Sequence, residues 1–474
     1  MSDIQDVDVC VIGGGSGGLS IAAGAAQLGA RTVLVERHKM GGDCLNYGCV
    51  PSKALLAAGR AAHALGRGAP FGVAPAPAAV DFARVHAHVQ GVIAEIAPVD
   101  SVERYRALGV EVVSASAKFV GRREIEAGGR RIRAKWFAVA TGSRAGVPPI
   151  PGLADVPHLT NETIFDLAAL PRHLIVIGGG PIGCEMAQAF RQLGVRVSVL
   201  EVMTLLGKDD PEAAEIVRRR LRRDGVEIRE GIRIARIDQS PGGIDVRIEH
   251  GGKAETVSGS HVLVAAGRIP NVEGLGLEQA GIIYSKKGIQ VDARLRSSNK
   301  RVFAVGDVAG GYQFTHIAGY HAGIVIRNAL FRLPAKVDYR AVPWVTYTDP
   351  QLAQVGLNES DAKTQHGEIS VLRWPYREND RAQAERTTDG FVKVLTTRRG
   401  HILGATIVGA DAGDLLLPWA LAIQNKLKIG AMAGVIAPYP TLSEISKRAA
   451  GTYFMPKLFT ERTRKIVRFL MKLA

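Results

Sequence analysis

A duplicated glycine-rich motif constrains the fold of this chain more than any other feature of its sequence. The segment DVDVCVIGGGSGG is an apolar run that ends in G-x-G-x-x-G, and HLIVIGGGPIG repeats this arrangement farther along the chain. Each copy continues into a helical pattern and then into a second apolar run, TVLVE or VSVLE, that ends in a glutamate. Because strand, glycine turn, helix and strand occur twice at the same spacing, the sequence predicts two βαβ units.

Both predicted units have the parts of a dinucleotide-binding fold. The first glycine makes the tight turn, the second lets the backbone approach a pyrophosphate, and the third lets helix and strand pack closely. The helix N-terminus supplies partial positive charge, and the glutamate can accept hydrogen bonds from an adenosine ribose. One such motif is weak evidence, but two in the same context are strong. We therefore expect two dinucleotides, of which FAD plus NAD(P) is the usual pair; the residues are Gly13, Gly15, Gly18 and Glu36 in the first copy, and Gly178, Gly180, Gly183 and Glu201 in the second.

Two later strands also end in glycine turns. HVLVAAGRIPN contains Gly267, and RVFAVGDVAGG contains Gly306 and Asp307. A carboxylate at the end of this strand could bind a ribitol hydroxyl, although an aspartate in an ordinary turn is the alternative. A helix is expected from about Thr315 to Asn328, and its positive end would suit the negative charge of a reduced flavin.

The length of 474 residues predicts about three domains rather than one core. From about Val342 the strand, hairpin and helix patterns contain no nucleotide motif, and this region is interpreted as a dimerisation domain of a homodimer. The expected fold class is α/β, with two Rossmann-like dinucleotide-binding domains plus a C-terminal α+β dimerisation domain. The expected boundaries are 1–152 and 272–341 for the two parts of an FAD-binding domain, 153–271 for an NAD(P)-binding domain, and 342–474 for the dimerisation domain.

The charge balance is strongly basic, with a formal net charge of +15. Most lysines and arginines are scattered, which favours a generally basic surface. Two clusters stand out, Arg218–Arg223 and Arg462–Lys472, but neither lies in a recognisable nucleic-acid module, so no nucleic-acid partner is expected. The second cluster has apolar residues at helical spacing opposite a basic face. We expect a helix docked on its own dimer, with weak attachment to an anionic membrane surface as the alternative.

The N-terminus indicates no secretory signal. It carries acidic residues and runs directly into an apolar strand, and no run of about 18 uncharged apolar residues follows. A cytoplasmic enzyme is therefore expected.

The chain has four cysteines, too few for a disulfide framework. Cys10 in an apolar strand and Cys184 in a helix are interpreted as core thiols. Cys44 and Cys49 can form a short-loop disulfide at the start of a helix, where the helix dipole and Lys53 would lower the pKa of one thiol. An inert pair and half of a zinc site are the alternatives. Because the sequence contains no second cysteine pair or His-x-His cluster, no metal site is expected.

Taken together, GGDCLNYGCVPSK, the two G-x-G-x-x-G units, ATGSRAGVPPIPG, the AVGD strand and PTLSE resemble the pyridine nucleotide-disulfide oxidoreductases. That family includes dihydrolipoamide dehydrogenase, glutathione reductase and mercuric reductase. The resemblance extends over almost the whole chain, and the cysteine motif is highly specific.

The resemblance implies an order of electron flow from NAD(P)H through FAD to the cysteine pair. Cys49 would be the charge-transfer thiol against the flavin, and Cys44 the interchange thiol that meets substrate. Lys53 and Glu185 match the lysine–glutamate pair that lies beside the flavin in this family. FAD would be held by Gly13, Gly15, Gly18, Glu36 and Asp307, and the nicotinamide cofactor by Gly178, Gly180, Gly183 and Glu201, with Thr141, Gly142, Gly267 and Gly306 as further cofactor-binding positions.

NADH is expected rather than NADPH. Glu201 would face the extra phosphate of NADPH, and no arginine lies within three residues of it to compensate.

The chain departs from the family pattern at its C-terminal motif. Disulfide-reducing members have His-Pro-Thr-x-x-Glu, in which the histidine is an acid–base group for the interchange thiol, whereas this chain has Tyr439 and retains Glu444. A tyrosine of ordinary pKa ~10 is only about 0.1% ionised at pH 7 and is a poor base. Mercuric reductases also carry tyrosine in this region. Unlike those enzymes, the sequence has neither a C-terminal vicinal cysteine pair nor an N-terminal metal-binding domain.

The leading hypothesis is an FAD-dependent NAD(P)H oxidoreductase that passes electrons through a Cys44–Cys49 disulfide to a thiol-reactive acceptor. The acceptor would be a soft metal ion such as mercuric ion, a small disulfide or a quinone-like oxidant. Dihydrolipoamide dehydrogenase of a 2-oxo acid complex is the alternative enzyme. A flavin-bearing redox sensor or membrane-associated partner protein is the alternative of another class.

Overall fold

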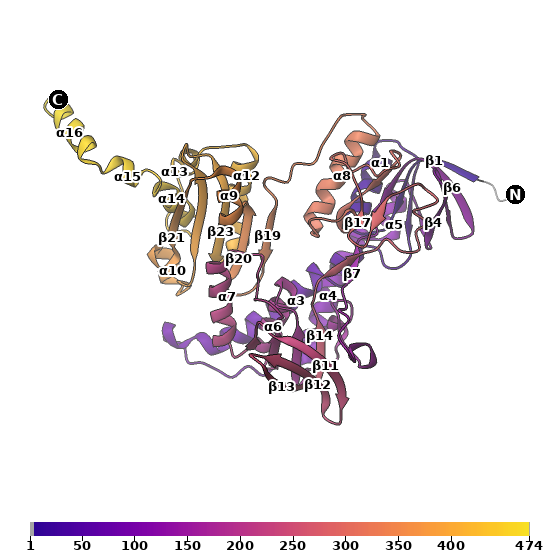
Figure 1. Ribbon diagram of the computed structural model, residues 1–474, viewed down its shortest axis with the longest axis horizontal. Coiled ribbons are helices and arrows are strands. Elements are labelled where there is room, and N and C mark those ends of the chain that lie inside the picture. The colour runs from indigo at the N-terminus through magenta and orange to yellow at the C-terminus, as the bar shows by residue number, and fades with distance from the viewer. Residues whose placement is uncertain (1–3, 474) are drawn as a thin grey trace. The chain divides into compact units, whose positions relative to one another are not determined.

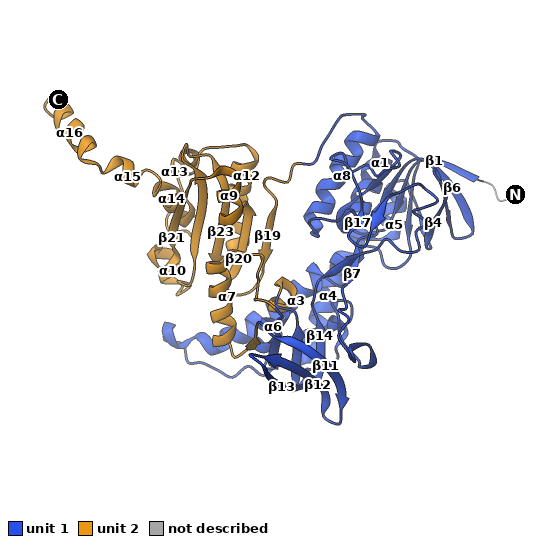
Figure 2. Ribbon diagram, in the orientation of Figure 1, with its two compact units in different colours: residues 1–179, 186–202, 231–337 blue, residues 180–185, 203–230, 338–474 orange. Residues whose placement is uncertain are grey.

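The computed structural model describes residues 4–473 and divides into two compact units, blue and orange in Figure 2 (see also Figure 1). Unit 1 comprises Met1–Gly179, Met186–Val202 and Gly231–Val337, and unit 2 comprises Gly180–Glu185, Met203–Glu230 and Asp338–Ala474. The expected α/β class is confirmed. The finer boundaries expected for the two cofactor domains stay a prediction.

Unit 1 contains a seven-stranded sheet with the first strand of the chain near its centre. The strand order is β3 (Val110–Ser114), β2 (Thr32–Glu36), β1 (Ile4–Ile12), β6 (Arg130–Val139), β5 (Glu124–Ala127) and β4 (Ala117–Gly121), and β18 (Val302–Ala304) pairs with β6. The β3-β2-β1-β6 and β6-β18 pairings are parallel, whereas β4, β5 and β6 form an antiparallel meander. Helices α1 (Ser16–Gln27) and α8 (Thr315–Ala329) pack on one face.

A second parallel arrangement repeats the pattern within unit 1. Strand β8 (His173–Ile177) pairs with β9 (Arg196–Leu200) and β14 (His261–Val264), and α6 (Pro181–Gln192) connects β8 to β9. The antiparallel strands β11 (Arg233–Ser240), β12 (Gly243–His250) and β13 (Lys253–Gly259) share a core with β8 and β14. Both predicted βαβ units are therefore present, as β1-α1-β2 and β8-α6-β9.

The remaining helices and strands of this part of the chain are short or peripheral. They are α2 (Gly42–Asn46), α3 (Cys49–Ala64), α4 (Phe82–Ile96), α5 (Val102–Ala107), β7 (Ser143–Ala145), β15 (Arg268–Pro270), β16 (Tyr284–Ser285) and β17 (Gly288–Ile289). The short strand β10 (Glu227–Arg229) belongs to unit 2.

Unit 2 contains a five-stranded antiparallel sheet with helices. The order is β19 (Pro343–Thr346), β20 (Gln351–Gly356), β23 (Ile402–Gly409), β22 (Phe391–Thr397) and β21 (Ile369–Pro375). Its core includes the fully buried Trp419 and Tyr376. The helices of the unit are α7 (Pro211–Arg223), α9 (Glu359–His366), α10 (Asp380–Ala384), α11 (Ala412–Leu415), α12 (Leu417–Gln424), α13 (Ile429–Ala433), α14 (Glu444–Gly451), α15 (Met455–Leu458) and α16 (Glu461–Leu470).

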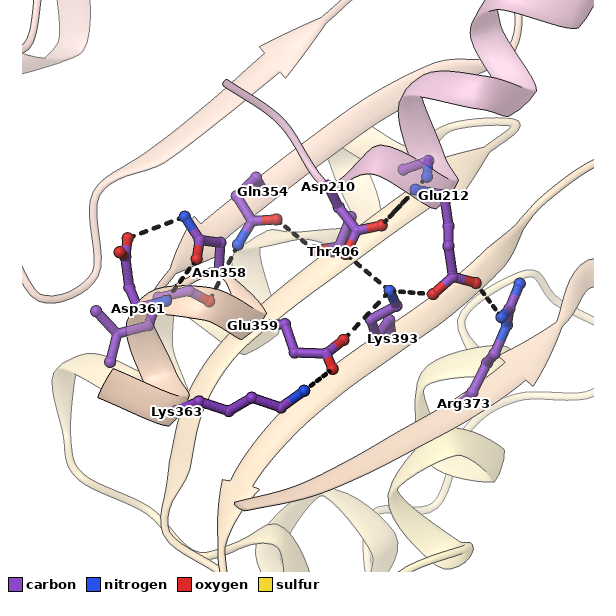
Figure 3. A network of polar contacts seen from close by, with 12 residues as sticks. Asp210, Glu212, Gln354, Asn358, Glu359, Asp361, Lys363, Arg373, Lys393 and Thr406 are labelled. Carbon is purple, nitrogen blue, oxygen red and sulfur yellow. Dashed lines mark hydrogen bonds and ion pairs between the residues drawn. The ribbon is translucent and has the colours of Figure 1, made fainter. Parts of the chain in front are cut away.

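A buried ion-pair network ties the start of α7 to this sheet (Figure 3). Lys393 on β22 is only 3% exposed, and its Nζ lies 2.8 Å from Asp210 Oδ2 and 2.5 Å from Glu212 Oε1. Although burial alone would lower the pKa of Lys393, its hydrogen bonds to the two carboxylates raise it. The buried charge is therefore compensated, and breaking one partner would be strongly destabilising.

The arginine cluster on α7 is also largely paired with acidic residues. Arg218 contacts Glu215 and Glu230, and Arg220 contacts Asp224 and Asp349. This pairing leaves α7 a poor surface for phosphate groups. Among residues 4–473, no helix is both long and apolar enough to cross a bilayer.

Candidate functional site

The first glycine loop connects β1 to α1 and has a conformation that only glycine tolerates. Gly13 has φ +110°, and a Cβ on it would collide with the Ala140 carbonyl group. A Cβ on Gly18 would collide with the carbonyl oxygen of Gly13. At the end of β2, Glu36 Oε2 accepts a hydrogen bond from the Gly14 amide at 2.5 Å. The acidic residue is therefore held directly at the glycine loop.

The second loop, between β8 and α6, reproduces this geometry. Gly178 also has φ +110°, and a Cβ on it would collide with the Ala265 carbonyl group. Glu201, which directly follows β9, accepts a hydrogen bond from the Gly179 amide at 2.6 Å. The duplication seen in the sequence is thus a duplication of backbone conformation and of hydrogen bonding.

Both loops fit the pyrophosphate of a dinucleotide. The middle glycines, Gly15 and Gly180, are open to approach: the nearest atom to a Cβ on Gly15 would be Gly42 Cα at 3.8 Å, and among the described residues none lies within 4 Å of a Cβ on Gly180. Neither α1 nor α6 has an acidic residue in its first turn, so no carboxylate of the helix itself opposes an anion at its N-terminus. A side chain in place of either glycine would fill the space that a pyrophosphate needs.

The later glycine turns lie around Asp307, which is in a short 3-10 helix after β18. Asp307 Oδ2 accepts a hydrogen bond from Ser143 Oγ at 2.5 Å and lies 3.7 Å from Arg268 Nε. Burial raises the pKa of Asp307, against the effects of Ser143 and Arg268. Strands β7 and β15 pair beside it, which brings the turn residues of the two strands together. The residues directly before β7, β15 and Asp307 are Gly142, Gly267 and Gly306, and all three have positive φ. Thr141, before Gly142, donates a hydrogen bond from its Oγ1 to the carbonyl oxygen of Asn271.

The cysteine pair lies where two helices begin. Cys44 is on α2 and is half-buried, whereas Cys49 is the first residue of α3 and is exposed. Cys49 Sγ lies 3.4 Å from Oγ1 of Thr315, the first residue of α8. Because helix N-termini carry partial positive charge, this arrangement favours a thiolate at Cys49.

The two thiols have opposite acidities. The Cys44 thiol donates to Cys49 and, against the effect of burial, lowers the pKa of Cys49 to about 6, with further contributions from Thr315 and Lys53. The same interaction and burial raise the pKa of Cys44. At neutral pH the pair therefore carries a thiolate on Cys49 and a proton on Cys44. The other two thiols, Cys10 and Cys184, are fully buried, as expected for core residues.

Sequence reasoning missed the residues that hold the cysteine segment in place. Asp43, next to Cys44, accepts a hydrogen bond from Asn161 at 2.9 Å and pairs with Arg268 at 3.1 Å. Nothing in the sequence near Asn161 or Arg268 indicated this contact. The sequence showed the AVGD motif and the start of the helix at about Thr315, but it did not show that Thr315 contacts Cys49.

His321 on α8 was also missed. It is 1% exposed, its Nδ1 accepts the Gly306 amide at 3.1 Å, and burial lowers its pKa to about 4. A neutral His321 therefore fixes the backbone directly before Asp307.

Lys53 and Glu185 belong to different units, so their expected pairing stays a prediction. Lys53 Nζ lies 3.4 Å from Ser52 Oγ on α3. Glu185 is 5% exposed, and its Oε1 accepts the Tyr347 amide at 2.9 Å.

Tyr439 lies in the loop before α14 and is 70% exposed. Its hydroxyl donates to Asp380 Oδ2 at 3.1 Å, and this hydrogen bond raises the pKa of Tyr439. Glu444 is the first residue of α14. At neutral pH, Tyr439 is thus ionised to an even smaller extent than an ordinary tyrosine.

Family models match both parts of the chain. The pyridine nucleotide-disulphide oxidoreductase model matches residues 7–322, and the dimerisation domain of the same family matches residues 342–450. The C-terminal region is therefore a dimerisation domain, as expected.

Curated relatives of two activities have similar identities. A mercuric reductase of Staphylococcus aureus is 36% identical over 94% of this chain and 82% of its own length. A dihydrolipoyl dehydrogenase of Geobacillus stearothermophilus is 34% identical over 94% of this chain and 96% of its own.

Solved structures agree in fold. The Cu(II) complex of the HOCl-induced flavoprotein disulfide reductase RclA from Escherichia coli has a TM-score of 0.84 at 26% identity. LpdA from Mycobacterium tuberculosis has a TM-score of 0.86 at 28% identity. Each match covers 94% of this chain and 99% of the other. Members of this family use FAD and NAD(P)H, and the chain belongs to it: it is a pyridine nucleotide-disulphide oxidoreductase with the dimerisation domain of that family.

Proposed function

We propose that the chain is an NADH-dependent reductase of a soft, thiophilic metal ion, and that the Cys44–Cys49 pair is the group that meets this ion. FAD would be held by the first glycine loop, Glu36 and Asp307, and the nicotinamide cofactor by the second loop and Glu201. Bound FAD would supply the transfer of an electron pair from the nicotinamide to the cysteine disulfide. The observation that carries the proposal is the pair itself, with a thiolate at Cys49 and a second thiol beside it.

The two thiols have separate roles in this proposal. Cys49, with its lowered pKa and its contacts to Thr315 and Lys53, would be the thiolate held against the cofactor. Cys44 would exchange with the incoming ligand and deliver its proton as it binds. Thiolate sulfur is the ligand type that soft metal ions prefer.

Proton balance explains why Tyr439 suits a metal ion better than a disulfide. Reduction of a divalent ion such as Hg²⁺ to the zero-valent metal by NADH releases one proton and consumes none. Reduction of a disulfide by NADH consumes one proton, since two thiols form. A disulfide reductase therefore needs an acid–base group at the interchange thiol, and loss of such a group typically costs ~10²–10⁴-fold. Tyr439, with its raised pKa, is poorly suited to that task.

Dihydrolipoamide dehydrogenase is the second candidate. Glu444 stands where that enzyme's motif has the glutamate that orients the histidine, and the identity to the dehydrogenases is close to that of the mercuric reductases. Small disulfides and quinones remain acceptors to test.

Steady-state oxidation of NADH by the purified holoenzyme with a panel of acceptors tests the proposal. The panel is Hg²⁺ with excess thiol, Cu²⁺, lipoamide, glutathione disulfide and a quinone. We expect the highest kcat/KM with a metal ion. In Tyr439→His, with Glu444 present to orient the ring, lipoamide turnover should rise by ~10-fold or more.

Asp380→Ala is the matched control because it removes the hydrogen-bond partner of the Tyr439 hydroxyl without supplying a base. Wild-type lipoamide turnover above that with any metal ion, unchanged in Tyr439→His, would overturn the proposal in favour of the dehydrogenase. NADH oxidation with none of the acceptors would leave the redox sensor as the function.

A further inference from the structure

The last helix of the chain is separated from the core of unit 2. Helices α15 and α16 extend from the orange unit in Figure 2, and the apolar cluster of that unit has no member beyond Phe454 among the described residues. The dimerisation-domain match ends at residue 450, before either helix begins. RclA and LpdA are matched over 99% of their lengths while 94% of this chain is covered, so this chain has residues without a counterpart in those structures. We refer to residues 455–473 as the tail.

The tail is amphipathic, with its apolar side in solvent. On α16, Ile466, Phe469 and Leu470 recur at the i, i+3, i+4 spacing of one helix face, and they are 49%, 62% and 56% exposed. Leu473 continues this spacing and is 69% exposed. Because burying apolar side chains is favourable, this exposed face favours a binding partner that covers it.

Basic residues occupy the opposite side of the same helix. Arg464, Lys465 and Arg468 follow the i, i+1, i+4 spacing, and Lys472 extends the row. Glu461 is the one acidic residue of segment 461–473, and its contacts to Arg464 and Arg468 are long, at 3.8 and 3.7 Å. The row therefore keeps most of its positive charge.

The composition of the chain argues against a second copy as the partner of this helix. The chain has 60 lysines and arginines against 45 acidic residues, so a second copy carries a net charge of the same sign as the tail. An anionic lipid surface offers both an apolar interior for the leucine and phenylalanine side chains and negative headgroups for the cations. A helix with this division of faces lies in the plane of such an interface.

We propose that the tail attaches the enzyme reversibly to anionic lipid surfaces through α16. One short helix binds weakly, but a dimer formed through the dimerisation domain would carry two tails. Two linked contacts raise the overall affinity above that of either alone. The attachment would bring a reductase to the membrane surface without any spanning helix.

Flotation of the full-length holoenzyme with vesicles tests this proposal. We expect binding to phosphatidylglycerol–phosphatidylcholine vesicles at low salt, release at high salt, and no binding to phosphatidylcholine alone. R464Q/K465Q/R468Q should weaken the binding by about 100-fold, since each basic residue near such a surface contributes about fivefold. F469S/L470S should weaken it at all salt concentrations by removing the apolar contact.

The matched control is R377Q/R398Q/R399Q, which removes three exposed cations elsewhere in unit 2 and should bind as wild type. NADH oxidation and FAD content, unchanged in all variants, show that the fold is intact. Failure of the wild type to float with anionic vesicles, or equal loss in the control variant, would overturn the proposal. Dissociation of the dimer in F469S/L470S, measured by sedimentation, would identify the second copy as the partner and also overturn it.

Discussion

The two glycine loops have the same backbone conformation but are surrounded by different segments of the chain. In the first, the segment that carries the cysteines packs against the loop: the Gly41 amide donates to the Gly14 carbonyl oxygen at 2.9 Å, and a Cβ on Gly42 would lie 2.7 Å from Gly15 Cα. In the second, no described residue lies within 4 Å of a Cβ on Gly180. A loop with a second segment packed against it suits a dinucleotide that stays bound, and a loop without one suits a dinucleotide that exchanges in every turnover. The duplication thus gives two loops with the same conformation, and we infer that the segments around them distinguish the cofactors they bind.

The largest effect is expected from the cysteines attached to the first loop. Cys44→Ser should stop turnover with every acceptor and leave the long-wavelength absorbance that a thiolate gives beside a flavin. Cys49→Ser should also stop turnover and, unlike Cys44→Ser, should abolish this absorbance. The spectra of the NADH-reduced variants check this, and absorbance that persists in Cys49→Ser would reverse the assignment of the two thiols.

The middle glycines provide a matched pair of substitutions. Both positions accept a Cβ without collision, so Gly15→Ala and Gly180→Ala should each fold. Gly15→Ala should purify with much less FAD, because the methyl group occupies the place of the pyrophosphate. Gly180→Ala should keep its FAD and show a KM for NADH raised roughly tenfold. Flavin content and steady-state kinetics measure both, and loss of FAD in Gly180→Ala would contradict the division of roles.

The glutamates at the two loops should differ in what they select. Glu201 should favour NADH over NADPH by about tenfold or more, through repulsion of the extra phosphate. Glu201→Gln should reduce this preference, whereas Glu36→Gln should leave it unchanged and lower FAD retention. The ratio of kcat/KM for the two cofactors is the measurement. Equal efficiency of NADH and NADPH in the wild type would refute the role of Glu201.

The smallest effect is expected at Thr315. Its hydroxyl helps to lower the pKa of Cys49 to about 6, so the thiolate is lost as the pH falls through 6. Thr315→Val removes this contact with little change of shape and should raise the pKa by about one unit. At pH 7 the thiolate fraction would then fall from about 90% to about 50%.

A pH titration of the ultraviolet thiolate absorbance of the reduced enzyme measures this shift. Thr364→Val on the surface helix α9 is the control. An unchanged midpoint in Thr315→Val would remove Thr315 from the account.

The sequence predicted local features well and long-range contacts poorly. Strand β2 ends at Glu36 and α8 begins at Thr315, as expected, because strand and helix boundaries follow from neighbouring residues. The contact between Cys49 and Thr315 joins residues 266 positions apart and depends on β18 adding to the sheet beside β6. No single segment of the sequence determines the order of the strands in that sheet.

Buried polar residues were hidden for a related reason. Lys393 lies on strand β22, and a lysine in a strand is ordinarily expected to reach solvent. Its side chain is instead buried against Asp210, which lies 183 residues earlier in the sequence. His321 appeared as one more residue of a helix, although its ring holds the backbone of Gly306. In both cases the function of the side chain depends on a partner that only the tertiary fold supplies.

The most direct test of the account is a count of thiols after anaerobic reduction by NADH. The oxidised holoenzyme is treated with a slight excess of NADH, and accessible thiols are then titrated without denaturation. Transfer of the electron pair to a Cys44–Cys49 disulfide consumes one NADH, leaves a thiol on Cys44 and a thiolate on Cys49, and predicts two new titratable thiol groups per chain. The buried Cys10 and Cys184 should not react. Full reduction of the flavin with no new thiols would contradict the claim that electrons leave this enzyme through the cysteine pair.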